Sequence, residues 1–434
     1  MGMGVVGGGV ATSLLGQPNA LARKIGCPIS LKKVLVRDLA KHGQANLPAG
    51  VLTTNPEEIL DDSDIHVVVE VMGGTEPAAG YMKQALSSGK HVVTANKEVM
   101  SKHGPELISL ANRNGVNLLY EASVGGGIPI VGSLMGDLAA NNVQSIRSII
   151  NGTTNYILTR MAHDGADFDQ ALREAQQRGY AESDPTNDVE GIDAAYKISI
   201  LASLAFHKIV GPDDVFRQGI SNLEPQDFRY ALELGYAIKS LAIATLNDGQ
   251  VKARVYPAML PFDHMLAKVD GVYNAVEVEG DLCGKVLFHG MGAGREPTTS
   301  AVLGDVIEAS RSLVSRAGPT HQDHSSNIDL TEPPTRADES GSGDSNIDDL
   351  ICKYYLRLNV LDRPGVFAQI GHVLGDGEIS IASVLQKDTN QSEQTAEIVI
   401  TTHPAVESSV QASIQALNAL EVVRDVSNVL RIEE

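Results

Sequence analysis

The chain of 434 residues, 43% of them hydrophobic, is long enough for about three domains. A formal net charge of -20 without a dense basic run argues against nucleic acid or an anionic membrane surface as a partner, although a few local donors can still hold a small anionic ligand. Three cysteines without CxxC spacing exclude a disulfide scaffold and a cysteine zinc site, and the chain shows neither a membrane-length apolar run nor a signal peptide, so we expect a cytoplasmic protein.

The first 150 residues alternate short β-branched runs with helical patterns. Strands are predicted at Val34–Val36, Ile65–Val71, His91–Thr94, Val116–Glu121 and Ile146–Ile150, and helices around Pro56–Leu60, Pro77–Ser88, Pro105–Asn114 and Ile130–Ala140. Apolar strands separated by helices are typical of an α/β fold with a doubly wound, Rossmann-type parallel sheet. Such sheets bind their ligands at the C-terminal ends of the strands.

The remaining chain contains two further patterns of secondary structure, separated by a linker. An α+β region is predicted from helices at Asp169–Arg178, Ile192–Phe206 and Pro225–Leu246 and strands at Lys252–Leu260 and Ala275–Glu279, followed by a helix at Thr298–Ser315. Residues 317–349, with Pro-Pro and Gly-Ser-Gly, predict a disordered linker. A ferredoxin-like β-α-β-β-α-β order is then predicted at Lys353–Val360, Val366–Leu374, Ile379–Gln386, Thr395–Thr401, Val406–Ala419 and Val422–Ile432.

A glycine-rich segment, Gly2-Met3-Gly4-Val5-Val6-Gly7, matches the G-x-G-x-x-G fingerprint of dinucleotide-binding sheets. In that fingerprint the first glycine makes a tight turn, the second lets a pyrophosphate approach the backbone, and the third lets helix and strand pack. No strand precedes it here, so we expect that the chain starts at an internal methionine and lacks a short first strand. A mobile glycine-rich terminus is the alternative.

The strand Val34–Val36 ends in two charged residues that bear on the cofactor. Arg37 can accommodate the 2′-phosphate of NADP, whereas Asp38 can bind the ribose hydroxyls of NAD. A solvated charge at the strand end is an equally weighted alternative.

Two lysines stand at chemically suggestive positions. Lys97 directly follows a buried strand, at the edge where sheet ligands bind, although a single lysine there is more often a surface charge. Lys197 lies one helical turn after Asp193, and the apolar residues that continue this face predict that it is at least partly buried. The acidic loop Gly179–Gly191 precedes it, which favours a carboxylate-rich pocket for a substrate ammonium; a surface ion pair is the alternative, and a calcium loop fits poorly.

Three further segments carry weaker signals. Asn151–Asn155 favours a helix cap. Glu121–Pro129 offers exposed carbonyls and one carboxylate, which suits a hard monovalent cation but is more often an ordinary loop. Gly290–Thr298 precedes a helix and either closes over a cofactor or makes a turn. Hydrolase motifs such as HExxH and GxSxG are missing from the sequence.

Taken together, these segments resemble homoserine dehydrogenase. The matching segments, in order, are Gly2–Gly7, Glu70–Glu76, Thr94–Lys97, Glu121–Pro129, Asn151–Asn155, Gly179–Lys197 and Gly292–Thr298. The tail, with Leu361-Asp362-Arg363-Pro364-Gly365-Val366 after its first strand, resembles an ACT domain. The resemblance implies an NAD(P)-binding domain at 1–129 and about 290–318, a substrate and dimerisation domain at 130–289, a disordered linker at 319–349 and an ACT domain at 350–434. The family has a complete strand before its glycines, and this chain departs from it there.

The resemblance also implies an activity, the reversible NAD(P)H-dependent reduction of L-aspartate 4-semialdehyde to L-homoserine on the route to threonine, methionine and isoleucine. It makes Lys197 the proton donor, Lys97 the second active-site lysine, and Glu182 and Asp193 substrate-contacting carboxylates. The cofactor residues that it implies are Gly2, Gly4, Val5, Val6, Gly7, Arg37, Gly73, Thr75, Lys97 and Gly292. The sodium site that it implies comprises Glu121 and the carbonyls of Val124, Gly126 and Ile128.

The chemistry of the residues agrees with these roles. Hydride delivery to an aldehyde creates an alkoxide that a nearby ammonium can stabilise and protonate. A free lysine is a poor acid at neutral pH, but two lysines in one cleft lower a proton affinity. We hypothesise that Glu182 and Asp193 pair with the substrate ammonium and so release Lys197 to act.

Other functions remain open from sequence alone. The chain could be an inactive dehydrogenase scaffold whose ACT domain senses an amino acid, or a dehydrogenase for a related amino aldehyde. We expect a homo-oligomer, most simply a dimer, with Asp362–Gly365 as the effector loop and threonine as the first effector to test.

Overall fold

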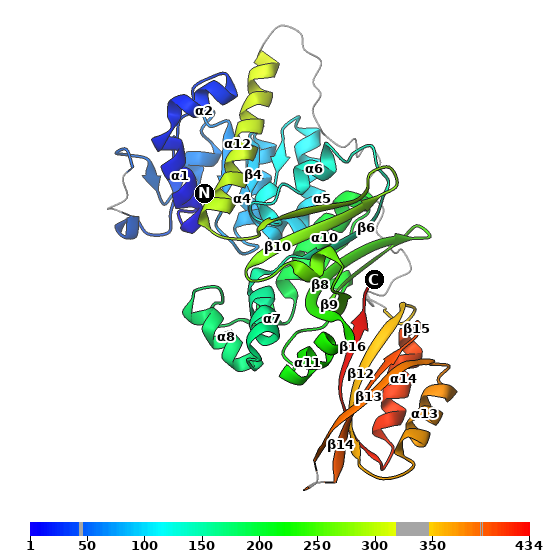
Figure 1. The fold of residues 1–434 in the computed structure, drawn as a ribbon. Coiled ribbons are helices and arrows are strands. Elements are labelled where there is room, and N and C mark those ends of the chain that lie inside the picture. The colour runs from blue at the N-terminus through cyan, green and yellow to red at the C-terminus, as the bar shows by residue number, and fades with distance from the viewer. Residues whose placement is uncertain (43–46, 318–346, 391, 393) are drawn as a thin grey trace.

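The computed structural model describes residues 1–42, 47–317, 347–390, 392 and 394–434 (Figure 1). Most of the predicted linker, 318–346, therefore lies outside the described residues. The N-terminal part contains a parallel sheet in the order β3-β4-β5, with strands β3 (Val67–Glu70), β4 (His91–Thr94) and β5 (Leu118–Leu119). A second parallel pair joins β1 (Val34–Leu35) to β2 (Leu52–Thr53). The predicted Rossmann-like parallel arrangement is confirmed here, with shorter strands than the apolar runs suggested.

Met1 and Gly2 lie between these two parallel sheets. The Gly2 amide donates to the Leu35 carbonyl at 3.1 Å, and the Val71 amide donates to the Met1 carbonyl at 3.0 Å. The Met1 amine donates to the Val69 carbonyl at 2.5 Å, and its burial lowers the pKa of this amine to about 6. Two residues thus connect β1 to β3, and a cavity of about 560 Å³ between α1, β3 and α12 adjoins them.

Helices cover both faces of the parallel strands (Figure 1). Their bounds are α1 (Val5–Gly16), α2 (Pro18–Ile25), α3 (Glu57–Leu60), α4 (Ala78–Ser87), α5 (Lys97–Arg113) and the late helix α12 (Arg295–Ala317). Helix α12 follows the other helices by almost 200 residues in sequence, yet it packs on α1 and β3. A late segment of the chain therefore lies against the early parallel strands.

The middle of the chain forms a large mixed sheet with helices on it. Its strands are β6 (Val143–Ile149), β7 (Val215–Arg217), β8 (Tyr236–Asn247), β9 (Gln250–Pro261), β10 (Tyr273–Gly280) and β11 (Gly284–Met291). Its helices are α6 (Val131–Met135), α7 (Gly152–Asp164), α8 (Phe168–Gln177), α9 (Thr186–Val189), α10 (Ile192–Phe206) and α11 (Pro225–Leu234). Helix α10 packs between this sheet and α5, which joins the two regions.

Two predicted elements are wrong in this region. The segment Ile146–Ile150 is not a strand of the parallel sheet, because β6 pairs antiparallel with β8 and β10. The helix predicted over Pro225–Leu246 ends at Leu234, since Gly235 adopts a left-handed conformation with φ of 86°. The chain then enters β8, where apolar residues on both faces are buried against neighbouring layers.

The C-terminal unit has the predicted β-α-β-β-α-β order, with one additional two-residue strand before its second helix. Its elements are β12 (Ile351–Leu361), α13 (Val366–Asp376), β13 (Ile381–Asn390), β14 (Thr395–Thr402), β15 (Ala405–Val406), α14 (Glu407–Asn418) and β16 (Val423–Ile432). Strand β16 pairs in parallel with β9, at Arg431 with Ala258 and Ile432 with Met259. The C-terminal sheet is therefore continuous with the mixed sheet, in the order β11-β10-β6-β8-β9-β16-β12-β14-β13.

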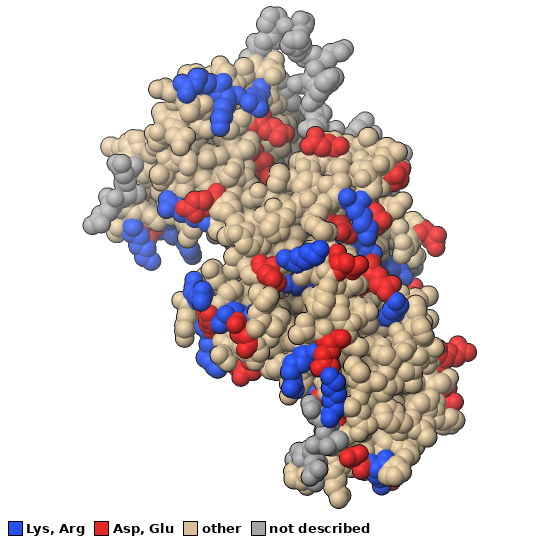
Figure 2. Space-filling view, in the orientation of Figure 1, with Lys and Arg blue, Asp and Glu red and all other residues tan. Residues whose placement is uncertain are grey.

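Acidic and basic side chains lie side by side over the middle of the face drawn in Figure 2. Within the described part of the chain, none of the helices combines the length and apolar character that crossing a bilayer requires.

Candidate active site

Lys97 is the first residue of α5 and directly follows the buried strand β4. Asn96 fixes this junction, because its side-chain oxygen accepts the Val99 amide at 3.1 Å and its Nδ2 donates to the Gly74 carbonyl at 2.8 Å. A helix cap of this kind satisfies a backbone amide that has no partner within the helix. The Lys97 ammonium is thereby held at the C-terminal edge of the parallel sheet, where the sequence predicted it.

Helix α10 presents the other lysine. Gly191 precedes the helix with φ of 75°, and a Cβ there would lie 3.0 Å from Val255 of β9, so glycine is needed at this entry. Asp193 and Lys197 then lie one turn apart. Asp193 is only 3% exposed, which favours the buried alternative over a surface ion pair.

The two lysines converge on one carboxylate. Lys97 Nζ bonds Asp193 Oδ1. Lys197 Nζ donates to Asp193 Oδ2 at 2.6 Å and to the Ile150 carbonyl at 3.0 Å. These contacts join residues 96 positions apart in sequence, from the parallel sheet and the mixed-sheet region.

The charged groups in this cluster shift the pKa values of one another. Burial would raise the pKa of Asp193, but the two ammonium groups outweigh it and hold this pKa well below its usual range. Burial, together with the nearby charge of Lys97, lowers the pKa of Lys197 even though Asp193 opposes the shift. Burial also disfavours the charged form of Lys97, yet Asp193 prevails and raises the pKa of Lys97. Lys197 is thus the better proton donor of the two.

Sequence reasoning missed two members of the cluster, Asn151 and Asp188. Asn151 Nδ2 donates to Asp188 Oδ1 at 2.7 Å and to Asp193 Oδ2 at 2.8 Å, while its Oδ1 caps α7 through the Thr154 amide at 2.9 Å. Asn151 therefore both caps the helix, as predicted, and bridges two acidic residues. Burial raises the pKa of Asp188. The density of acids in the sequence Asp184–Asp193 was the signal that could have singled out Asp188.

A cavity of about 320 Å³ opens beside the lysines. Lys97 and Lys197 line it together with residues that the sequence assigned to the cofactor or to the sodium loop, namely Val5, Val6, Gly73, Gly126 and Gly292. A Cβ at Gly126 would lie 2.5 Å from the Gly292 carbonyl, so the two loops touch backbone to backbone and admit no side chain. The predicted active-site and cofactor segments therefore share one cleft.

Two features beside the cleft are those of a dinucleotide-binding fingerprint. Val5 and Val6 form the first turn of α1, whose N-cap Gly4 offers no side-chain cap, so backbone amides of a 12-residue helix point toward the opening. Gly7 packs where a Cβ would overlap the Gly2 carbonyl, which is the close helix packing that the third fingerprint glycine provides. Five of the predicted cofactor residues lie outside the lining: Gly2, Gly4, Gly7, Arg37 and Thr75. Arg37 is exposed just beyond β1.

The structure places the two predicted substrate carboxylates differently. Asp193 already accepts hydrogen bonds from both lysines and Asn151, which leaves it little capacity for a substrate ammonium. Glu182 is exposed, and its carboxylate forms no hydrogen bond or ion pair with the described residues. Only its carbonyl is engaged, by Gln176 Nε2 at 3.1 Å.

The predicted sodium loop is a tight turn around Glu121. The carboxylate of Glu121 accepts the amides of Ile130, Val131 and Gly132 at 2.8, 3.0 and 2.6 Å, and so caps α6. Burial nevertheless raises the pKa of this carboxyl. The Ile128 carbonyl accepts the Ile130 amide, whereas those of Val124 and Gly126 accept no hydrogen bond from the part of the chain that the structure describes.

Comparisons with known proteins agree with this architecture. Family models for "Homoserine dehydrogenase, NAD binding domain", "Homoserine dehydrogenase" and "ACT domain" match residues 2–121, 129–307 and 354–422. A homoserine dehydrogenase of Synechocystis is 44% identical over 100% of this chain and 98% of its own. The crystal structure of a homoserine dehydrogenase from Thiobacillus denitrificans aligns with a TM-score of 0.89 at 41% identity, covering 100% of this chain and 97% of that one.

A third relative, a hyperthermophilic archaeal homoserine dehydrogenase in complex with NADPH, aligns with a TM-score of 0.61 at 28% identity, over 74% of this chain and 98% of its own. The coverage spans the parallel sheet, the lysine cluster and the C-terminal unit in the first two relatives. The chain, with its NAD-binding domain and C-terminal ACT domain, therefore belongs to the homoserine dehydrogenase family.

Proposed function

We propose that this chain catalyses the reversible NAD(P)H-dependent reduction of L-aspartate 4-semialdehyde to L-homoserine, with Lys197 as the proton donor. The observation that carries the proposal is the convergence of Lys97 and Lys197 on Asp193 at the wall of the glycine-lined cleft. An enzyme that reduces an aldehyde needs a cofactor cleft and a proton source side by side, and this cluster supplies the proton source.

The bound nicotinamide supplies the hydride to the aldehyde carbon, or accepts it in the reverse reaction. As the carbonyl oxygen becomes an alkoxide, a lysine ammonium beside it stabilises the charge and gives up a proton. Lys197 suits this step because its pKa is lowered by burial and by Lys97. Lys97, whose pKa is raised, stays charged and stabilises the negative charge that develops on the oxygen.

Asp193 positions the lysines in this proposal. Its two oxygens are divided between the ammonium groups, so it sets their separation and orientation. The substrate ammonium is then bound by Asp188 and by Glu182 on the acidic loop. Asp188 lies beside the cluster because it accepts a hydrogen bond from Asn151. This division of labour revises the hypothesis that Asp193 itself contacts substrate.

The test is direct. We expect purified protein to form NAD(P)H from L-homoserine, followed by absorbance of the reduced cofactor, and to consume it with L-aspartate 4-semialdehyde. A folded protein that binds amino acids but turns over neither substrate would favour the regulatory-scaffold alternative. Turnover of another amino aldehyde at a higher kcat/KM would point to the related dehydrogenase.

Cofactor choice is expected to depend on Arg37, which is exposed at the end of β1 where a 2′-phosphate would lie. We predict that Arg37→Ala raises the KM for NADPH about tenfold and leaves the KM for NADH nearly unchanged, because a charged hydrogen bond is lost only with the phosphorylated cofactor. Steady-state kinetics with both cofactors measures this. Arg113→Ala is the matched control, because Arg113 is an exposed arginine at the C-terminal end of α5, away from Lys97 at the start of that helix.

A sodium ion bound by the loop 124–128 is a further part of the proposal. The Val124 and Gly126 carbonyls are the ligands that remain open, and Glu121 holds the loop in shape by capping α6. We predict that Glu121→Ala, which removes this support, abolishes any gain in thermal stability when sodium chloride replaces choline chloride. Differential scanning calorimetry in both salts decides it; an equal response of the two proteins would argue that the ion does not bind here.

We also propose the domain division 1–129 with about 290–318, 130–289 and 350–434, a cytoplasmic location, and a homodimer. Strand β13 is at the end of the sheet order and carries the partly exposed Val384 and Ile381, which suits pairing with a second copy. Sedimentation equilibrium of the full chain tests the dimer.

A further inference from the structure

Helices α1 and α12 present their N-termini to the same cleft. Val5 and Val6, in the first turn of α1, line the cavity beside the lysines together with Ala293 and Thr298, which lie on either side of the start of α12. The later turns of both helices line the other cavity, that of about 560 Å³. The two helices therefore run in the same direction, and the positive ends of both helix dipoles face the cleft beside the lysines.

Helix α1 supplies no cationic side chain to this cleft. Residues 1–22 carry no charged side chain, so the glycine-rich segment contributes backbone amides alone. Lys97 and Lys197 line the cleft, but both ammonium groups are bonded to Asp193. In sheets of this type the pyrophosphate of a dinucleotide, which is anionic on both phosphates, is bound at the N-terminus of the first helix. A further cation beside that turn has to come from another element.

Arg295, the first residue of α12, lies against α1 close to that turn. Its Cγ is 3.4 Å from the position that a Cβ on Gly9 would take. Thr299, one turn later on α12, would overlap the same Cβ, so glycine permits this close approach of the two helices. Side chains of a helix tilt toward its N-terminus, which directs Arg295 toward the cleft. Val5 is four residues from Gly9, about 6 Å along the axis of α1.

The guanidinium of Arg295 has no partner in the described part of the chain. The residue is exposed, and it forms neither a hydrogen bond nor an ion pair with any described residue. A positive charge in the first turn also opposes the dipole of α12, whereas the negative charge of the neighbouring Glu296 complements it. The stability of its own helix therefore does not explain the position of Arg295.

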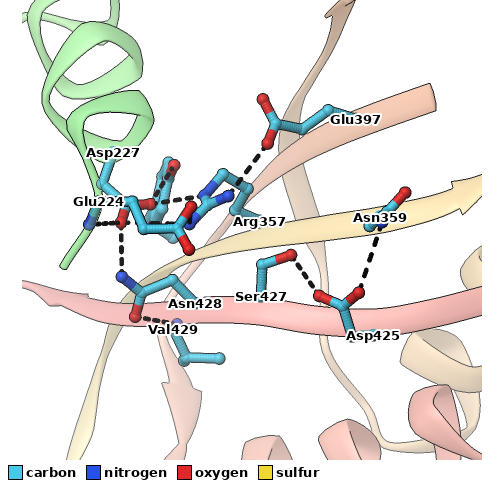
Figure 3. A network of polar contacts seen from close by, with 10 residues as sticks. Glu224, Asp227, Arg357, Asn359, Glu397, Asp425, Ser427, Asn428 and Val429 are labelled. Carbon is cyan, nitrogen blue, oxygen red and sulfur yellow. Dashed lines mark hydrogen bonds and ion pairs between the residues drawn. The ribbon is translucent and has the colours of Figure 1, made fainter. Parts of the chain in front are cut away.

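Arginines at the junction with the ACT domain are bound quite differently. Arg357 pairs with the fully buried Asp227 at 2.7 Å and with Glu397 at 3.0 Å (Figure 3). Arg431 donates to Glu407 at 2.8 and 2.6 Å. These guanidinium groups are committed to carboxylates of the protein and hold its elements together. Arg295 has no such carboxylate among the described residues, so its donors are available to an anionic ligand.

We propose that Arg295 binds the pyrophosphate of NADH or NADPH at the N-terminus of α1. The inference rests on the cofactor half of the proposed function and adds to it a residue outside the glycine-rich segment. Because the pyrophosphate is common to both cofactors, Arg295 contributes to the affinity for each of them equally. Arg37, at the end of β1, differs in this respect, since it is expected to act on the phosphorylated cofactor alone.

Equilibrium binding to the full chain tests this contact without any turnover. The chain has no tryptophan, so the fluorescence of the reduced nicotinamide can be followed in titrations with NADH and NADPH. ADP-ribose, which carries the pyrophosphate but no nicotinamide, is measured by displacement of NADPH. We expect Arg295→Ala to raise the Kd of all three at least about tenfold, because a charge-assisted hydrogen bond is lost. Arg23→Ala, at an exposed arginine near the end of α2, should leave all three unchanged.

Arg295→Lys, which keeps the charge, should lose less affinity than Arg295→Ala. Equal losses in the two variants would show that packing on α1, and not charge, is what the side chain supplies, and would overturn the proposal. So would unchanged Kd values in Arg295→Ala, a loss confined to NADPH, which indicates the 2′-phosphate, or a loss that spares ADP-ribose, which indicates the nicotinamide. A wild type that binds neither cofactor overturns both proposals. One that binds them but does not oxidise L-homoserine counts against the proposed function alone.

Discussion

Lys197→Arg is expected to lower kcat for homoserine oxidation by about 10²–10⁴-fold, the range that general acid–base groups contribute, with little change in KM. Arginine keeps a positive charge at the end of α10, but its guanidinium does not release a proton in the working pH range. The substitution therefore separates charge from proton exchange. Stopped-flow single-turnover measurements, which report chemistry apart from product release, are the appropriate assay.

The pH profile gives a second measure of the same role. In the oxidation direction Lys197 must be unprotonated to take the hydroxyl proton, so kcat should rise with pH through the lowered pKa of Lys197. This limb should vanish in Lys197→Arg and persist in Lys268→Arg, a matched change at an exposed lysine. Near-normal turnover with the limb intact would show that another group moves the proton.

The parts of the fold that sequence predicted well are those with strong local signals. Helix α10 has the predicted bounds Ile192–Phe206, because a glycine starts it and its residues are continuously apolar or helix-forming. Strand β4 has the predicted bounds His91–Thr94. The order of elements in the C-terminal unit followed from segments whose hydrophobic residues recur with the period of a strand or of a helix. Each of these signals lies within one element.

The errors came from residues whose surroundings are not local. Gly235 lies within a long helical pattern, but its left-handed conformation ends α11 and leads into β8. The apolar run at Ile146–Ile150 has the composition of a buried strand in either sheet, and only tertiary pairing assigns it to the mixed sheet. Continuity of the ACT sheet with β9 was equally hidden, because it depends on contacts between residues more than 170 positions apart, such as Arg431 and Ala258.

The candidate site shows the same division. Helical spacing alone put Asp193 and Lys197 on one face, and the position after a buried strand put Lys97 at the ligand edge. Sequence could not show that both ammonium groups share the carboxylate of Asp193, because that depends on how α5 packs against α10. It also could not show the bridge from Asn151, which caps α7, to Asp188 of α9.

Asp193→Asn should be the most damaging single change to the cluster. Removing one partner of a buried ion pair typically costs about 3–5 kcal/mol, and here two lysines lose the same counter-charge at once. We expect the free energy of unfolding in urea to fall by that order at neutral pH. Asp169→Asn, an exposed acid on α8, should leave it unchanged.

The pH dependence of this loss has a definite sign. Because the pKa of Asp193 is depressed in the folded protein, its stabilisation is fully present above the unfolded value, near ~3.9, and is lost as the pH falls through the folded value. The difference in unfolding free energy between wild type and Asp193→Asn should therefore be largest near neutrality and shrink below about pH 4. A difference independent of pH would mean that packing, and not charge, is what the carboxylate contributes.

The same variant should alter catalysis in a way that Lys197→Arg does not. Without the carboxylate of Asp193 the two ammonium groups lose the partner that they share, and only Lys197 keeps a further contact, to the Ile150 carbonyl. Misplacement by about 1 Å can cost 10²-fold in rate, so we expect kcat to fall by about that factor. Loss of the carboxylate also removes the charge that raises the pKa of Lys97 and that opposes the lowering of the pKa of Lys197 by burial. The rising limb of kcat in homoserine oxidation should consequently move toward lower pH by about 1–3 units. A limb that keeps its position, with KM raised instead of kcat lowered, would return Asp193 to the role of a substrate ligand.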